Sequence, residues 1–144
     1  MTTSVVPTDR FGEIDVDDDE IVALPEGFLG FGSITEIVLL PIDADGLFFW
    51  AQAVADPAVA FLVVTPWPLF PDYDVDLADA DQRELELDDA GDAVVLCVVT
   101  SHDDPRRFTA NLAGPLIINQ RLRRGRQVVL ETGLPTQADL PQLP

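Results

Sequence analysis

The chain has 144 residues, 47% of them hydrophobic, so it can bury a core without disulfides or metal ions. It carries 26 acidic residues against 8 basic ones, all arginine, and its formal net charge is −18. This charge argues against direct binding of nucleic acid phosphates, which needs clustered basic side chains, and against docking on an anionic membrane surface. Its apolar runs are far too short to span a bilayer.

The N-terminus has no basic segment followed by a long apolar core, so no signal peptide is expected. The single cysteine, Cys97, lies in an apolar run and is expected to be a small buried hydrophobe. Together these features predict a cytoplasmic protein. Residues 1–8 are expected to be frayed.

Segments of strand length then follow one another along the chain. Residues 11–16 alternate apolar and polar side chains, which is the period of a half-buried strand. Residues 21–24 indicate a second short strand that ends at Pro25. The next four runs are almost wholly apolar, which is typical of strands covered on both faces: 37–40, 47–54, 59–64 and 93–99. One short helix is expected around residues 80–84.

Residues 109–131 indicate two strands joined by a turn. Two apolar runs, 116–118 and 127–130, flank an arginine-rich turn in which Gly125 is expected to take a positive φ. Gly114-Pro115 interrupts the segment, because proline cannot donate a ladder hydrogen bond. Asn111 precedes this break, where its short amide is expected to satisfy free backbone groups.

These patterns predict a mostly β protein: a small antiparallel β-barrel or sandwich-like single domain with one or two short helices. The domain is expected to span residues 1–144, with its core at about 9–131 and a flexible C-terminal tail over 132–144. Charge is distributed unevenly in this domain. Residues 72–92 hold ten acids and one arginine, whereas residues 105–130 hold six arginines and no acid, which predicts an electrical polarity if the two segments do not pair.

No motif for catalysis or cofactor binding is found. The only histidine, His102, stands beside Asp103 and Asp104 in what is interpreted as a solvated turn, and no nucleophile elbow is present. The chain lacks a zinc ligand set. The sequence therefore predicts neither an enzyme nor a cofactor.

One acidic stretch matches four ligand positions of a calcium loop: Asp15, Asp17, Asp19 and Glu26. The sixth position, which should be glycine for the sharp turn, is Glu20, and the flanks indicate strands rather than helices. The interpretation is a solvated acidic turn and no metal site.

Six short motifs are each weak evidence when taken singly, but their order along the chain is specific. Taken alone, Trp67-Pro-Leu-Phe-Pro-Asp-Tyr-Asp-Val-Asp-Leu77 is an aromatic and proline-rich connection between strands. The other motifs stand before and after it: Pro25-Glu-Gly-Phe-Leu-Gly-Phe31, Phe61-Leu-Val-Val-Thr-Pro66, Thr109-Ala-Asn-Leu112, Gly114-Pro-Leu-Ile-Ile-Asn119 and Gly125-Arg-Gln-Val-Val-Leu130. Together, in this order, they resemble the FliW family of bacterial flagellar assembly factors. The resemblance covers about residues 9–131.

The resemblance implies a non-enzymatic, chaperone-like regulator with two protein partners, flagellin and the translational repressor CsrA. Free protein would bind CsrA and relieve the repression of flagellin mRNA translation, and accumulated flagellin would occupy the protein and restore repression. A monomer is expected.

The residues that would contact these partners fall into an apolar and an acidic group. The apolar candidates for flagellin are Trp67, Leu69 and Phe70, for which core packing is the alternative. The acidic candidates for CsrA are Asp72, Asp74, Asp76 and the 79–92 stretch, for which a solvated face is the alternative. Tyr73 and Asn111 complete the set of predicted partner-binding residues.

Two other functions stay open. A small-molecule-binding barrel would gather Trp50, Trp67 and Tyr73 around an interior cavity. A hydrolase or isomerase would place His102 in a cleft beside a carboxylate.

Overall fold

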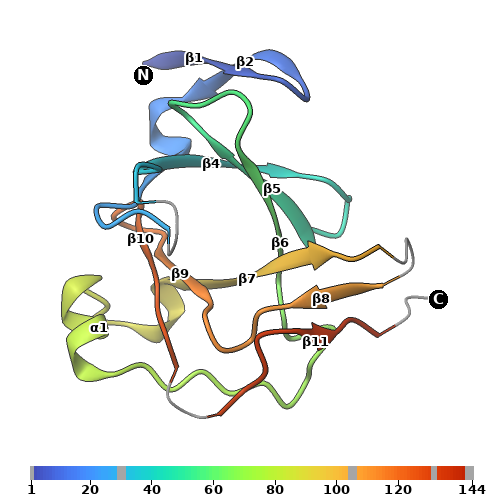
Figure 1. Cartoon of the computed structure of the whole chain (residues 1–144). Helices are drawn as coiled ribbons and strands as arrows, with labels where there is room; N and C mark the ends of the chain where they lie inside the picture. Colours follow the sequence, from blue (N-terminus) through green and yellow to red (C-terminus); the bar gives the residue numbers. More distant parts are fainter. Residues whose placement is uncertain (1, 29–31, 104–106, 131–132, 142–144) are drawn as a thin grey trace.

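The computed structural model describes residues 2–28, 32–103, 107–130 and 133–141, and its centre is a small β-barrel (Figure 1). Its strands are β1 (Thr3–Thr8), β2 (Gly12–Asp17), β3 (Ile21–Ala23), β4 (Glu36–Pro41), β5 (Phe48–Ala53), β6 (Ala60–Val64), β7 (Ala93–Ser101), β8 (Phe108–Ala110), β9 (Leu116–Asn119), β10 (Arg124–Gln127) and β11 (Ala138–Asp139). The helical segments are η1 (Asp18–Glu20), α1 (Asp79–Glu84) and η2 (Ala90–Asp92). The predicted mostly β barrel and the helix expected around residues 80–84 are confirmed. In the described part of the chain, no helix has the length and hydropathy needed to cross a membrane.

Seven strands close the barrel. They are hydrogen-bonded in the order β7-β6-β5-β4-β3-β10-β9, and β9 returns to β7. All of these pairings are antiparallel except β3 with β10, which is parallel and joins Ala23 to Arg124. Closure leaves these seven strands without the unpaired edges of an open sheet.

One edge of β7 pairs with two strands in succession. Its end pairs with β8, where Val99 faces Ala110, and its start pairs with β9, where Leu96 faces Leu116. Residues 111–115 bulge out between them. The Asn111 side chain stabilises this bulge, since its Oδ1 accepts hydrogen bonds from the N–H groups of Ala113 (3.1 Å) and Gly114 (2.9 Å). The predicted backbone-satisfying role of Asn111 is confirmed.

Alternation along the strands builds one core inside the barrel and two outside it. The inner core takes one face of each strand, including Val22, Ile37, Val63, Leu96 and Ile118, all at most 1% exposed. The second core, on the outer face of β6, β7 and β9, contains Val64, Leu69, Tyr73, Cys97 and Ile117. The third, against β4, contains Val6, Val16 and Val38.

Residues 3–8 form the strand β1, contrary to the expectation of a frayed end. β1 pairs with β2 along its whole length, and Val6 and Val16 are buried on Val38. The guanidinium of Arg10 also lies 4.2 Å from the centre of the Trp50 ring. The short alternation in residues 3–8 stabilises a strand only because β4 offers an apolar surface to cover.

The described part of the expected C-terminal tail, residues 133–141, also packs on the barrel. β11 pairs with β8, and Leu134, Ala138 and Leu140 cover the second core. The Leu112 N–H donates to the Pro135 carbonyl (3.1 Å). The apolar residues of this segment are isolated in a polar stretch and do not alternate as in a strand. Its own sequence therefore does not predict the contact with β8.

Gly125 has a different role from the predicted one. The positive φ of the turn belongs to Arg123 (φ 54°), whereas Gly125 lies within β10, opposite Ile118. A Cβ at Gly125 would lie 3.0 Å from Ile118 Cγ1, 3.1 Å from Leu24 Cδ2 and 3.2 Å from the Ile117 carbonyl oxygen. Glycine is therefore needed for close packing in the barrel interior. β10 accordingly covers 124–127 rather than the predicted 127–130.

Gly125→Ala is expected to lower the free energy of unfolding by about 1–3 kcal/mol, because the added methyl group overpacks the inner core. The control is Gly32→Ala, where a Cβ would meet no atom of the described residues within 4 Å; its effect should stay within about 0.5 kcal/mol. Urea unfolding of both variants measures the difference. Equal stability of the two variants would contradict the packing argument.

Cys97 is fully buried, with its Sγ 3.9 Å from the Tyr73 hydroxyl. Burial raises the pKa of the Cys97 thiol to about 11 from an ordinary value of 9.0. Because the pKa is raised in the folded state, the neutral thiol contributes its full stability below pH 9 and loses it as the pH rises toward 11. At pH 10 the wild type should have lost roughly 1 kcal/mol more than Cys97→Ala, relative to pH 8, in urea unfolding. Identical pH profiles would contradict the assignment.

Candidate partner-binding site

A surface groove of about 460 Å³ has a mostly apolar lining. It lies between the connection that precedes α1, the residues that follow α1, and the start of β7. We call it the Trp67 groove, and its lining residues are Trp67, Tyr73, Asp74, Val75, Asp76, Leu77, Gln82, Leu87, Asp88, Ala93 and Val95. The groove is an open surface feature, and the barrel interior contributes no cavity to it.

Two tight turns position the aromatic side chains of this groove. The N–H groups of Leu69 and Phe70 both donate to the Pro66 carbonyl, and the Tyr73 N–H donates to the Phe70 carbonyl. This geometry directs Leu69 and Tyr73 into the second core, where each is 7% exposed, and leaves Trp67 39% exposed. The Trp67 indole Nε1–H donates to the Tyr73 carbonyl (2.8 Å), so the ring is held at the rim.

Tyr73 connects the groove to the bulge between β8 and β9. Its hydroxyl donates to the Leu112 carbonyl (2.7 Å). Burial is the main cause that raises the pKa of the Tyr73 phenol above its ordinary value. The neighbouring Cys97 thiol raises this pKa further. The phenol is therefore a neutral hydrogen-bond donor, and its role here is to hold the connection on the barrel.

Residues 74–77 alternate acidic and apolar side chains. Asp74 and Asp76 are exposed, whereas Val75 and Leu77 are half-buried against the second core. Asp88 is exposed on the other side of the groove. Among the described residues, none of these three carboxylates has an ion pair or a side-chain hydrogen bond.

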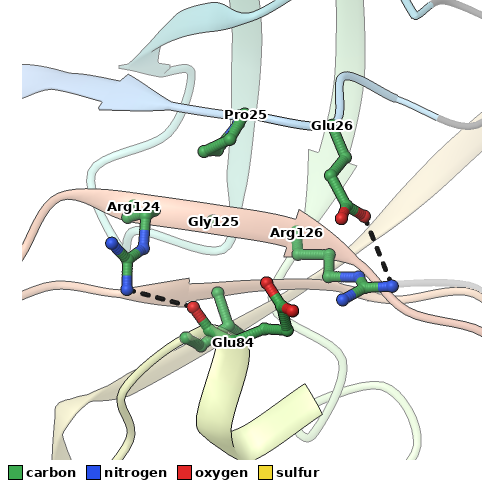
Figure 2. Close-up of a pocket in the computed structure, with 7 residues that line it drawn as sticks. Pro25, Glu26, Glu84, Arg124, Gly125 and Arg126 are labelled. Atoms are coloured by element: carbon green, nitrogen blue, oxygen red, sulfur yellow. Dashed lines mark hydrogen bonds and ion pairs between the residues drawn. The ribbon is translucent and has the colours of Figure 1, made fainter. Parts of the chain in front are cut away.

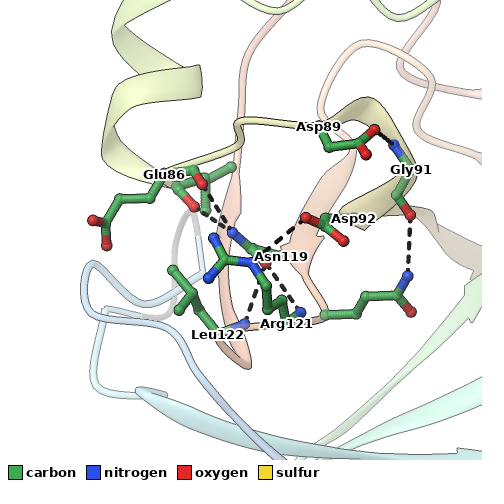
Figure 3. Close-up of polar contacts among 9 residues, drawn as sticks. Glu86, Asp89, Gly91, Asp92, Asn119, Arg121 and Leu122 are labelled. Atoms are coloured by element: carbon green, nitrogen blue, oxygen red, sulfur yellow. Dashed lines mark hydrogen bonds and ion pairs between the residues drawn. The ribbon is translucent and has the colours of Figure 1, made fainter.

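The buried Asn119 holds the end of α1 on the barrel (Figure 3). Its side chain is fully buried; its Nδ2 donates to the carbonyls of Leu85 (2.8 Å) and Glu86 (3.2 Å). Its Oδ1 accepts from the N–H groups of Arg121 (3.0 Å) and Leu122 (3.2 Å). Sequence reasoning missed this residue. The available signal was a polar amide at the end of the buried run 116–118.

The acidic and arginine-rich segments pair with each other. Arg124 contacts Glu86 (2.6 Å), Arg126 contacts Asp81 (3.6 Å), and Arg121 contacts Asp92 (3.6 Å). The predicted electrical polarity required that the two segments do not pair, and these ion pairs show that they do. Asp74, Asp76 and Asp88 at the Trp67 groove are not part of these ion pairs.

A second, smaller hollow of about 200 Å³ lies beside these ion pairs, between β10, Glu26 and the end of α1 (Figure 2). Arg126 contacts Glu26 (3.3 Å), and Arg124 donates to the Glu84 carbonyl (3.0 Å). Both guanidinium groups are thus engaged with protein oxygens. This hollow has less apolar surface than the Trp67 groove, and both of its arginines already have partners.

The structure gathers only part of the predicted partner-binding set. Trp67, Tyr73, Asp74 and Asp76 line one groove. Phe70 is half-buried on the second core, and Leu69 is buried in it, so the core-packing alternative describes Leu69. Asp72 is exposed but does not line the groove, and Asn111 uses its side chain within the bulge.

The residues of the open alternatives are separated. Trp50 lies beneath Arg10, away from the groove that Trp67 and Tyr73 line. His102 Nε2 lies 2.8 Å from the Thr109 hydroxyl, and among the described residues no ion pair joins it to a carboxylate; Asp104 lies outside these residues.

The four acids of the calcium-loop pattern do not share one loop. Asp15 and Asp17 belong to β2, Asp19 belongs to η1, and Glu26 contacts Arg126. Where the structure describes the chain, no group of three or more His, Cys, Asp or Glu side chains could hold a metal ion.

Asn119→Ala is expected to lower the free energy of unfolding by about 2–4 kcal/mol, because one buried and three partly buried backbone groups lose their partner. The control is Gln120→Ala, which removes one exposed hydrogen bond to the Gly91 carbonyl (3.1 Å) and should cost less than about 1 kcal/mol. Urea unfolding compares the two. Similar losses in both variants would contradict the anchoring role of Asn119.

Comparison with known proteins gives one consistent result. The family model described as "FliW protein" matches residues 5–140. The flagellar assembly factor FliW of Moorella thermoacetica is 46% identical over 127 residues, which are 88% of this chain and 80% of that protein. The corresponding factor of Magnetococcus marinus is 35% identical over 133 residues, covering 92% of this chain and 82% of that protein.

A solved structure leads to the same family. The crystal structure of the flagellar assembly factor FliW superposes with a TM-score of 0.84 at 30% identity, covering 96% of this chain and 99% of that one. The match thus includes the N-terminal hairpin and the C-terminal strand as well as the barrel. The chain therefore belongs to the FliW family of flagellar assembly factors.

Proposed function

We propose that this chain is a non-enzymatic, cytoplasmic flagellar assembly factor that binds flagellin and CsrA in turn. Bound to CsrA, it relieves the repression of flagellin mRNA translation. Bound to flagellin, it acts like a chaperone before export and leaves CsrA free to repress. Family membership supports this role. The Trp67 groove, with its apolar lining and its unpaired carboxylates, is the observation that supports a particular binding surface.

The apolar part of the groove suits flagellin. A protein that assembles outside the cell keeps apolar segments covered until it is exported, and such segments bind in apolar grooves. The Trp67 ring is 39% exposed yet fixed by its hydrogen bond to the Tyr73 carbonyl. A rigid aromatic side chain at the rim of a groove has the properties of an interface hot spot.

The acidic part suits CsrA, because an RNA-binding protein presents basic groups. A net charge of −18 steers such a partner toward this chain, and salt should weaken the complex. The apolar candidate Trp67 and the acidic candidates Asp74 and Asp76 line the same groove, so two partners that use it exclude each other sterically. Mutual exclusion through overlapping surfaces is sufficient for a partner switch.

A small-molecule site inside the barrel has less support. Buried aliphatic side chains from β3, β4, β5, β6, β7 and β9 fill that interior.

Trp67→Ala is expected to weaken flagellin binding by 2 kcal/mol or more, roughly 30-fold, as is typical of an aromatic hot spot. The control is Phe11→Ala, which removes a more exposed aromatic side chain (47%) on the turn between β1 and β2. Isothermal titration of each variant with the host's flagellin measures the effect. Circular dichroism and thermal melting confirm that both variants are folded.

The same titrations with CsrA, and with flagellin added to a preformed CsrA complex, test the switch. Displacement of CsrA by flagellin supports it. If Phe11→Ala weakens binding as much as Trp67→Ala, the groove is not the contact surface; if wild type binds neither protein, the proposed function is wrong.

A further inference from the structure

The backbone of residues 74–77 is unpaired although the side chains follow the period of a strand. Figure 1 shows this segment as an extended connection leading into α1. In the described part of the chain, no N–H of these four residues donates to a protein group. Among their carbonyls, only that of Leu77 accepts a hydrogen bond, from Gln82 Nε2 (3.1 Å).

The segment is nevertheless held in place at both ends. The Trp67 indole donates to the Tyr73 carbonyl at its start, and α1 begins at Asp79 after its end. Between them, Val75 and Leu77 pack against the second core. An ordered, strand-like segment with free backbone donors and acceptors is a template for main-chain pairing with another chain.

We propose that the Trp67 groove binds an extended peptide segment of a protein partner, which pairs with the backbone of residues 74–77 and alternates basic and apolar side chains. This inference rests on the proposed function, in that the groove is taken as the partner-binding surface. It adds the conformation of the bound segment and the spacing of its side chains.

Charge complementarity identifies the basic side chains. Asp74 and Asp76 are exposed and unpaired, Asp88 faces them from the other side, and no arginine lines the groove. Nearby acids such as Asp81 and Glu86 already have arginine partners. A basic group arriving at this surface therefore finds three carboxylates that no other group of the described chain neutralises.

The two-residue period identifies an extended segment rather than a helix. Side chains on one face of a strand recur every second residue, roughly 7 Å apart, and cross-strand neighbours share this spacing. A partner strand would place residues i and i+2 opposite Asp74 and Asp76. A helix repeats every three to four residues and cannot use the free backbone groups.

The probe is a short capped peptide in which Lys alternates with Val or Leu, labelled with fluorescein and titrated with the full chain by fluorescence anisotropy. Two further peptides carry N-methyl groups on alternate amides, one on each of the two sets. In main-chain pairing only one set faces the protein. One methylated peptide should therefore bind on the order of tenfold more weakly, and the other should bind nearly as well as the parent.

A peptide of the same composition with helical spacing controls for net charge and should bind more weakly than the parent. Chain variants supply the matching control: Asp74→Asn with Asp76→Asn should weaken binding about fivefold, whereas Asp15→Asn with Asp45→Asn removes two exposed charges elsewhere and should leave it unchanged. Equal loss from both methylated sets, equal binding of the helical peptide, or equal effects of the two double variants would overturn the inference.

The proposed function has a separate readout in the flagellin and CsrA titrations. If those partners bind through Trp67 while the alternating peptide fails, the extended-segment inference is wrong and the partner-binding role stands. If the peptide binds as expected while neither partner does, the groove recognises such segments and the proposed function is wrong.

Discussion

The pairing of β7 with β9 is the contact on which the rest of the molecule depends. It closes the barrel, and it gives β7 two buried faces, with Leu96 turned inward and Val95 and Cys97 outward. The outward face must be covered, because a strand of this composition cannot be left in water. The connection before α1 and the C-terminal segment cover it. The Trp67 groove is thus a consequence of barrel closure.

The arginine-rich turn and the acidic segment illustrate how charge is arranged around this framework. Asn119 holds the end of α1 against β9, which brings Glu86 and Asp81 within reach of Arg124 and Arg126. These exposed pairs contribute little stability individually. Their effect is to neutralise one side of α1. The carboxylates of Asp74, Asp76 and Asp88, which line the Trp67 groove and have no ion pair among the described residues, keep their charge available to a partner.

Apolar surface, unpaired charge and unpaired backbone therefore meet at one place on a small protein. Each feature alone has an ordinary explanation: a surface tryptophan, solvated acids, a loop between strands. Their coincidence within one groove, held rigidly through Trp67 and Tyr73, is what makes partner binding the best-supported role. The barrel makes the groove rigid, and the connection before α1 provides the apolar, acidic and backbone groups that line it.

Local patterns in the sequence were sufficient for the barrel strands other than β10, for the short helix and for the role of Asn111, because periodicity and turn chemistry act over a few residues. They failed at β1 and β11, whose short segments are stabilised only by distant surfaces, and at Gly125, whose neighbours Leu24 and Ile118 come from other strands. They also missed Asn119, since its partners Leu85 and Glu86 are remote along the chain. The groove itself depended on tertiary structure, because only packing decides that Tyr73 is buried while Trp67 stays exposed.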